Sequence, residues 1–140
     1  MTALQDVMVT NVAEVKPSDS LETLAREMDA HDVGFLPVVS EDKLVGVVTD
    51  RDIVRRGLAK DFKANSVEAQ QVMTEKVITG LPDMDVEEAS RLMQDHQIKR
   101  LLVTENDQLK GVVSLGDLAV SGNDQSAESA LSEIKKSDKQ

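Results

Sequence analysis

The chain has 140 residues, 40% of them apolar and 30% charged, which is the composition of a globular domain with a core of its own. It contains no cysteine, so disulfides, thiolate metal sites and cysteine nucleophiles are excluded. The net charge of −10 argues against broad electrostatic binding to nucleic acid or to anionic membranes. The sequence shows neither a membrane-spanning stretch nor a secretory signal, which predicts a cytoplasmic location.

A tandem repeat organises the chain. Shifted by 65 residues, the sequence aligns with itself without a gap, Val7 to Val54 against Val72 to Ala119, with 16 identities in 48 positions. Such self-similarity at a fixed offset indicates two copies of one structural unit. It predicts one unit at residues 1–59, a linker at 60–70, a second unit at 71–120 and a polar tail at 121–140, in which residues 127–134 could form a short helix.

Each copy predicts a strand and then a helix. The short first strand, at 12–15 or 77–78, precedes a proline. The helix is expected to begin at an N-cap residue, Ser20 or Asp85, and Glu88 has the spacing of a capping box with Asp85. The apolar stripes that would face the core are Leu21, Leu24, Ala25 and Met28 in the first copy and Val86, Ala89 and Met93 in the second.

Two further strands and a second helix complete each copy. Apolar runs predict strands at 35–39 and 44–49, and again at 101–104 and 109–114, with polar turns between them. The second helix should begin at Asp50 or Leu115, and Gly57 should end the first of these. The predicted fold class is α/β, in detail α+β. Two β-α-β-β-α units would pack sheet to sheet about a pseudo-twofold axis, because one copy alone has little apolar surface.

The most informative motif is GVVTDRD at 46–52, which recurs as GVVSLGD at 111–117. In both, a strand ends in a hydroxyl residue and an aspartate follows three residues later, in the first turn of a helix. Unpaired backbone N–H groups and the dipole at a helix start attract phosphate, and a carboxylate can accept from two sugar hydroxyls. The alternative is structural: Thr49 caps the helix and Asp52 favours its dipole.

Other candidate residues are weaker. Arg51 and Arg55 share one helix face, and Arg51 is the better placed of the two to reach a phosphate. His31 and His96 occupy equivalent helix ends, where histidine commonly caps carbonyls or favours the dipole. A metal site is the weaker alternative, because no third ligand is obvious, although carboxylates could serve. No nucleophile or P-loop motif occurs, so an enzyme is not expected.

The repeated pattern of a proline, an amphipathic helix ending near Met and His, and G-V-V-[ST]-x-x-D resembles the CBS domain, two of which in tandem form a Bateman module. The resemblance covers about residues 4–120. It implies two clefts between the units that bind AMP, ADP, ATP or a related adenosyl ligand. Thr49 and Ser114 would contact phosphate, and Asp52 and Asp117 would contact ribose. The residues that the resemblance places around the adenine are Thr10, Val12, Phe35, Leu36, Pro37, Ile78, Arg100 and Leu101.

The copies differ at the expected site. Leu102 stands where the first copy has Pro37, and Leu115-Gly116 where it has Asp50-Arg51; Lys99 and Arg100 replace Gly34 and Phe35. We therefore expect the clefts to differ and the one built on Thr49 and Asp52 to bind better.

The predicted function is that of a stand-alone regulatory sensor of adenine nucleotides, with no other cofactor. The resemblance suggests a homodimer, and the output would pass through oligomer contacts or an unidentified protein partner. The alternative is a structural or dimerisation module that binds no ligand and holds a partner protein.

Overall fold

The computed structural model describes residues 2–60 and 63–120, and the predicted helix at 127–134 lies outside these ranges. The chain forms two compact units. One is Ala13–Val77, called here the Thr49 unit. The other, called the Ser114 unit, combines the N-terminal residues up to Val12 with the chain from Ile78 onward. Each unit is described by itself.

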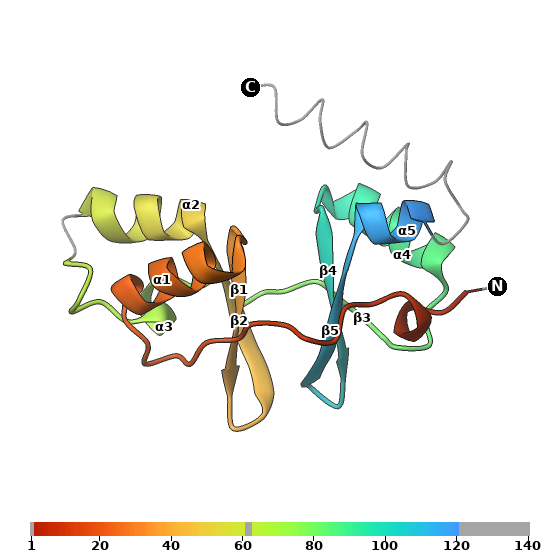
Figure 1. The fold of residues 1–140 in the computed structure, drawn as a ribbon, viewed down its shortest axis with the longest axis horizontal. Helices are drawn as coiled ribbons and strands as arrows, with labels where there is room; N and C mark the ends of the chain where they lie inside the picture. Colours follow the sequence, from red (N-terminus) through yellow and green to blue (C-terminus); the bar gives the residue numbers. More distant parts are fainter. Residues whose placement is uncertain (1, 61–62, 121–140) are drawn as a thin grey trace. The chain divides into compact units, whose positions relative to one another are not determined.

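In the Thr49 unit, one helix and a hairpin are followed by a second helical segment (Figure 1). The elements are α1 (Leu21–His31), β1 (Phe35–Ser40), β2 (Lys43–Thr49), α2 (Asp50–Asp52), the π-helical turn η2 (Ile53–Gly57), the 3-10 turn η3 (Leu58–Lys60) and α3 (Ala69–Val72). Strands β1 and β2 are antiparallel, and their register sets Phe35 opposite Thr49. Thr49 therefore lies where the hairpin meets the helix.

The Ser114 unit repeats this plan with one more strand. Its elements are η1 (Leu4–Asp6), β3 (Thr79–Gly80), α4 (Val86–His96), β4 (Arg100–Glu105), β5 (Gln108–Ser114) and α5 (Leu115–Val120). The strand order is β3-β4-β5, with β3 parallel to β4 and β4 antiparallel to β5. Arg100 lies opposite Ser114, as Phe35 lies opposite Thr49. The mixed helices and small sheets confirm the α+β class.

Each unit has its own apolar core between the helices and one face of the hairpin. Helix α1 contributes Leu21, Leu24 and Met28 to the core of the Thr49 unit, and α4 contributes Val86, Ala89 and Met93 to that of the Ser114 unit. The predicted apolar stripes are thus confirmed except at Ala25, which is exposed. Among the described residues, none of the helices is long and apolar enough to cross a membrane.

Two equivalent segments are exchanged between the sequence repeats. Residues 7–9 (the first strap) pair with the Ser114 unit, where the N–H of Val9 donates to the carbonyl of Val112 at 2.9 Å. Residues 72–74 (the second strap) pair with the Thr49 unit, where the N–H of Val47 donates to the carbonyl of Thr74 at 2.9 Å. Each strap therefore packs on the hairpin of the repeat to which it does not belong in sequence.

The exchange extends into the cores. Leu4, at the start of the chain, is fully buried among residues of the Ser114 unit. Val67 and Ala69, in the segment assigned to the linker, and Val72 are buried in the core of the Thr49 unit. This part of the connecting segment is consequently an element of the first core.

The first strand of each copy differs from its prediction. Residues 12–15 form only a single bridge, between Val15 and Val38, and the strand expected at 77–78 lies two residues later, at Thr79–Gly80. The short segments have few partners along one edge of a hairpin, so apolar composition alone misplaces them.

The helix ends show one prediction confirmed and two that are wrong. The Ser20 hydroxyl accepts from the N–H of Thr23 at 3.2 Å, as an N-cap should. Asp85 makes no such cap and no capping box with Glu88; here the next N–H, that of Val86, donates to the Thr2 carbonyl. Gly57 does not end its helix, which continues to Lys60.

Candidate functional site

Both hydroxyl–carboxylate motifs form reciprocal capping boxes. Thr49 Oγ1 accepts from the N–H of Asp52 at 3.0 Å, and Asp52 Oδ2 accepts from the N–H of Thr49 at 3.0 Å. In the other unit, Ser114 Oγ accepts from the N–H of Asp117 at 3.1 Å, and Asp117 Oδ2 accepts from the N–H of Ser114 at 2.9 Å. The structural interpretation of these residues is confirmed.

Capping leaves each pair with chemistry to offer a ligand. Each hydroxyl acts as an acceptor in the box, so its own proton can still be donated to a phosphate oxygen. Each carboxylate uses Oδ2 for the box, and Oδ1 remains an acceptor. The box also fixes both side chains, which lowers the entropy that binding would cost.

Arg56 is a neighbour of the site that sequence reasoning missed. Its Nε lies 3.8 Å from Asp52 Oδ1, and its Nη1 donates to the carbonyls of Val72 at 3.5 Å and Met73 at 3.3 Å. It therefore connects Asp52 to the second strap. The i,i+4 spacing from Asp52 to Arg56 was the available sequence signal, because such pairs meet on a helix surface.

The backbone at the start of α2 differs from the expectation. The N–H of Asp50 donates to the Gly34 carbonyl at 2.8 Å, and that of Arg51 donates to Asp50 Oδ1 at 2.8 Å. The N–H of Asp52 is occupied by Thr49. The prediction that unpaired N–H groups here would bind phosphate is thus wrong, because the chain itself supplies acceptors to all three. Any phosphate at this helix must be met by side chains.

Four of the remaining predicted residues fall into two settings. Phe35 and Arg100 lie at the strand positions opposite Thr49 and Ser114, so the register brings each pair together. The side chains of Leu36 and Leu101 are fully buried in the two cores and can support a site only through their backbone. Their grouping around one adenine stays a prediction.

The other four residues complete the predicted set. Pro37 is buried within β1, between Leu36 and Val38. Thr10 and Val12 belong to the Ser114 unit, where Thr10 is exposed and Val12 half-buried. Ile78, 36% exposed, belongs to the same unit.

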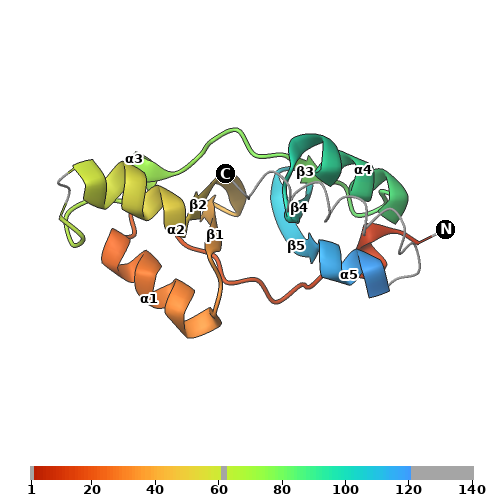
Figure 2. The ribbon, with the colours of Figure 1, turned by 90° about the horizontal axis from the view of Figure 1, so that it is seen from above.

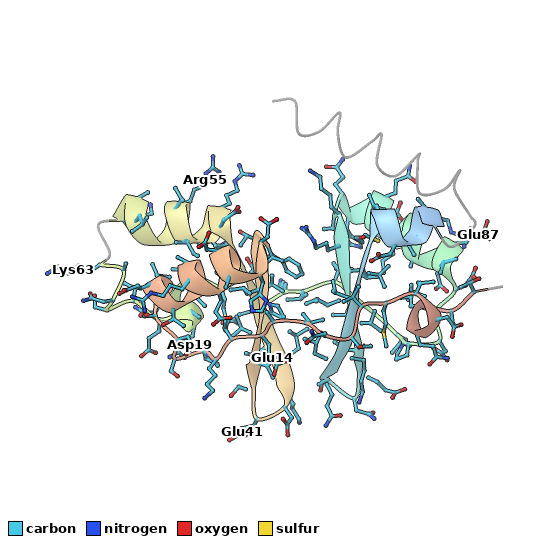
Figure 3. All side chains as sticks on the ribbon, in the orientation of Figure 1. Glu14, Asp19, Glu41, Arg55, Lys63 and Glu87 are labelled. Carbon is cyan, nitrogen blue, oxygen red and sulfur yellow. The ribbon has the colours of Figure 1, made fainter. Side chains whose placement is uncertain are left out.

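A cavity of about 400 Å³ lies at the other end of the hairpin in the Thr49 unit. It is bordered by the turn residues Glu41 and Asp42 and by Glu14 and Lys16, and it includes none of the predicted ligand-binding residues. Figure 3 shows Glu41 at this turn, far from Arg55 on the helix. Within residues 2–60 and 63–120, no three His, Asp or Glu side chains are grouped so that they could hold a metal ion.

Comparison with known proteins decides the family. The model of the CBS domain matches residues 4–59 and, a second time, residues 69–121. The chain belongs to the CBS-domain family. The tandem repeat is therefore a pair of CBS domains, as the doubled motif indicated.

Two of the relatives are proteins of similar length. The CBS domain-containing protein YhcV of Bacillus subtilis is 41% identical over 135 residues, which cover 96% of both chains. Hypoxic response protein 1 of Mycobacterium tuberculosis is 32% identical over 120 residues, covering 85% of this chain and 84% of the relative.

Two solved structures show the same fold. The crystal structure of Hypoxic Response Protein I with two coordinated zinc ions has a TM-score of 0.78 at 32% identity and covers 85% of this chain and 98% of that one. The CBS domain pair of protein MJ0100, in complex with 5′-methylthioadenosine and S-adenosyl-L-methionine, has a TM-score of 0.75 at 25% identity, covering 89% and 98%. The ligands named are those of these proteins.

Proposed function

We propose that this CBS pair is a non-enzymatic regulatory protein that binds an adenine nucleotide, AMP, ADP or ATP. The observation that carries the proposal is the pair of pre-formed hydroxyl–carboxylate motifs, Thr49 with Asp52 and Ser114 with Asp117, at equivalent positions of both repeats. The adenosyl ligands of the related MJ0100 pair support it, since they share the nucleoside part of the proposed ligand.

Each motif divides the nucleotide between its two members. The hydroxyl of Thr49 or Ser114 donates its proton to a phosphate oxygen. The Oδ1 atom of Asp52 or Asp117 accepts from the ribose hydroxyls, as an ionised carboxylate does well. The residues predicted around the adenine, which lie on β1 and β4 and in the segments that follow the straps, would complete the contact.

The proposed output is a shift in conformation rather than a reaction. A ligand that prefers one arrangement of the protein raises the population of that arrangement, and a binding partner can detect the change. We propose that the protein acts in the cytoplasm as a homodimer and signals to a separate protein.

The test uses the absence of Trp and Tyr, because the purified protein then absorbs little near 280 nm and co-purified nucleotide dominates near 260 nm. The nucleotide is identified by mass after denaturation. AMP, ADP and ATP are then tested for thermal stabilisation, which is expected of any ligand that prefers the folded state.

Single variants assign the effect to a site. Asp52→Ala and Asp117→Ala are each expected to reduce the ligand-induced shift in Tm, with Asp52→Ala the more damaging. The shift is the readout, because losing the capping box lowers the starting Tm as well. Asp29→Ala, an exposed aspartate on α1, is the matched control. A spectrum free of nucleotide together with no shift for any adenine compound would favour a ligand-free interaction module instead.

A further inference from the structure

One helical segment of the Thr49 unit carries several cations close together. Although the chain carries a net charge of −10, the segment formed by α2, η2 and η3 contains four cations, Arg51, Arg55, Arg56 and Lys60, within eleven positions. Arg56 is engaged with Asp52 and with two backbone carbonyls. Arg51 and Arg55 form no ion pair with any residue in the described ranges, although the chain has 26 acidic residues.

These two arginines share one side of the helix. They are four residues apart, which places their Cβ atoms about 5–6 Å from each other on a helical surface. Arg51 lies in the first turn of the helix that Thr49 caps, and Arg55 lies about one turn further along it. Both side chains are exposed, and Figure 3 shows that of Arg55 extending away from α1. They are spaced to contact successive groups of an elongated anion.

The backbone at this helix start cannot take the role of the arginines. The N–H groups of Asp50, Arg51 and Asp52 already have acceptors within 3.0 Å. The carboxylate of Asp50 also lies beside Gly34, where a Cβ would be 3.0 Å from Asp50 Oδ2. A phosphate near Thr49 thus meets negative charge and no open backbone donors, so guanidinium groups must neutralise it.

The second repeat lacks this arrangement. The positions equivalent to Arg51 and Arg55 are Gly116 and Val120, neither of which carries a charge. Two adjacent cations of the second repeat, Lys99 and Arg100, are located where β4 begins instead. The helix-borne pair is therefore a property of the Thr49 site alone.

We propose that Arg51 and Arg55 form a clamp for the outer phosphates of the ligand, so that the Thr49 site prefers nucleoside di- and triphosphates to AMP and to uncharged adenosyl compounds. The inference rests on the proposed function, because it names the ligand class of the same site. Arginine suits this task because its planar fork binds phosphate oxygens bidentately.

The decisive experiment compares adenosine, AMP, ADP and ATP by isothermal titration calorimetry at constant ionic strength. The titrations use the Asp117→Ala background, which removes the proposed ribose acceptor of the other site. If that variant is unstable, the wild-type protein is titrated instead and its data are fitted with two binding sites. Arg51→Ala/Arg55→Ala should weaken ATP binding by about 10–100-fold, AMP binding by less than about threefold, and leave adenosine unchanged. An equal loss for adenosine and ATP, or no loss for ATP, overturns the clamp.

The matched control is Arg26→Ala. Arg26 is exposed on α1 and pairs with Glu22, so the substitution changes the net charge by one unit in the same protein unit. ATP affinity should stay within about twofold of the parent. If Arg26→Ala weakens ATP as much as either single arginine substitution in the clamp, the effect is one of general charge and the proposal fails.

Titration with inorganic tripolyphosphate distinguishes a failure of the proposed clamp from a failure of the proposed function. If no adenine compound binds the wild-type protein, nucleotide sensing is refuted, and tripolyphosphate decides about the clamp by itself. Binding that is lost in Arg51→Ala/Arg55→Ala supports a polyphosphate site without a nucleoside. Absence of tripolyphosphate binding in that case refutes the clamp as well.

Discussion

Gly46 and Gly111 each belong to the repeated sequence motif and also allow a strap to pack closely against a hairpin. Each opens the G-V-V-[ST]-x-x-D motif, yet the structure gives the glycine a packing role. A Cβ at Gly46 would lie 2.9 Å from the Thr74 carbonyl oxygen, and one at Gly111 would lie 2.8 Å from that of Val9. Only a residue without a side chain lets a strap approach so closely.

We predict that Gly46→Ala and Gly111→Ala each destabilise the protein by about 1–3 kcal/mol, because the strap backbone must move to admit a methyl group. Urea unfolding measures the loss. Gly116→Ala is the control, since its Cβ would meet only Ser114 Oγ at 3.5 Å, an ordinary contact. Equal stabilities for Gly46→Ala and Gly116→Ala would contradict this account of the strap.

At the candidate site, the sequence predicted the spacing of Thr49 and Asp52 but not how Asp50 behaves. Helical phase places a residue three positions after an N-cap in the first turn, so the box follows from spacing alone. That the Asp50 carboxylate turns back to accept from the N–H of Arg51 depends on the Gly34 turn beside it, which lies 16 residues earlier. Contacts of that kind are tertiary and leave no local pattern.

Among the elements, both hairpins have two-residue turns in which non-glycine residues adopt positive φ angles. Glu41 and Asp42 both have positive φ, 51° and 66°, and so do Asn106 and Asp107, 54° and 66°. Two-residue turns of this kind normally take Asn-Gly, because other side chains are strained in the left-handed region. The Glu41-Asp42 turn therefore stores strain within β1–β2.

Replacing this turn should stabilise the Thr49 unit. Glu41→Asn/Asp42→Gly is expected to raise the free energy of unfolding by about 1 kcal/mol, observable as an increased Tm by calorimetry. The reverse change in the other hairpin, Asn106→Glu, should lower Tm. If the first substitution lowers Tm, the carboxylates at the turn contribute more stability than their strained backbone costs.

The helix that follows β2 extends past the boundary that its glycine predicts, to Lys60. A glycine near a helix end normally marks a left-handed cap, and Gly57 was interpreted in that way. In the structure Gly57 is buried, and a Cβ there would lie 2.5 Å from Leu21 Cδ1. The residue serves the close approach of two helices, seen from above in Figure 2, and sequence alone does not distinguish the two uses.

For the whole molecule, the exchanged straps make each core depend on both repeats. The sequence established two similar copies, the helices and the longer strands, because periodic apolar patterns are local. It could not show which hairpin a strap joins, since both hairpins carry the same Gly-Val-Val acceptor. The predicted sheet-to-sheet packing of the copies stays a prediction.

Leu4→Ala tests whether the N-terminal segment belongs to the core of the Ser114 unit. The side chain is 0% exposed, so its truncation should cost about 2–5 kcal/mol. Hydrogen exchange measured by mass spectrometry should show the greatest loss of amide protection in α4 and β4 of the Ser114 unit. The amides of β1 in the Thr49 unit should be less affected.

The control is Leu81→Ala, at a residue that is 54% exposed, which should change stability by less than about 0.5 kcal/mol. If Leu4→Ala accelerates hydrogen exchange more in β1 than in β4, the result contradicts the packing of Leu4 in the core of the Ser114 unit.

The strap exchange also determines where this chain can be divided. A fragment cut at the boundaries of the first sequence repeat, 1–59, would carry Leu4 without its neighbours and would lack Val67, Ala69 and Val72. A fragment from Ala13 to Val77 retains every buried member of its core. The piece that keeps its core intact is thus out of phase with the duplication, and a single copy cut at the repeat boundaries would lack part of its interior.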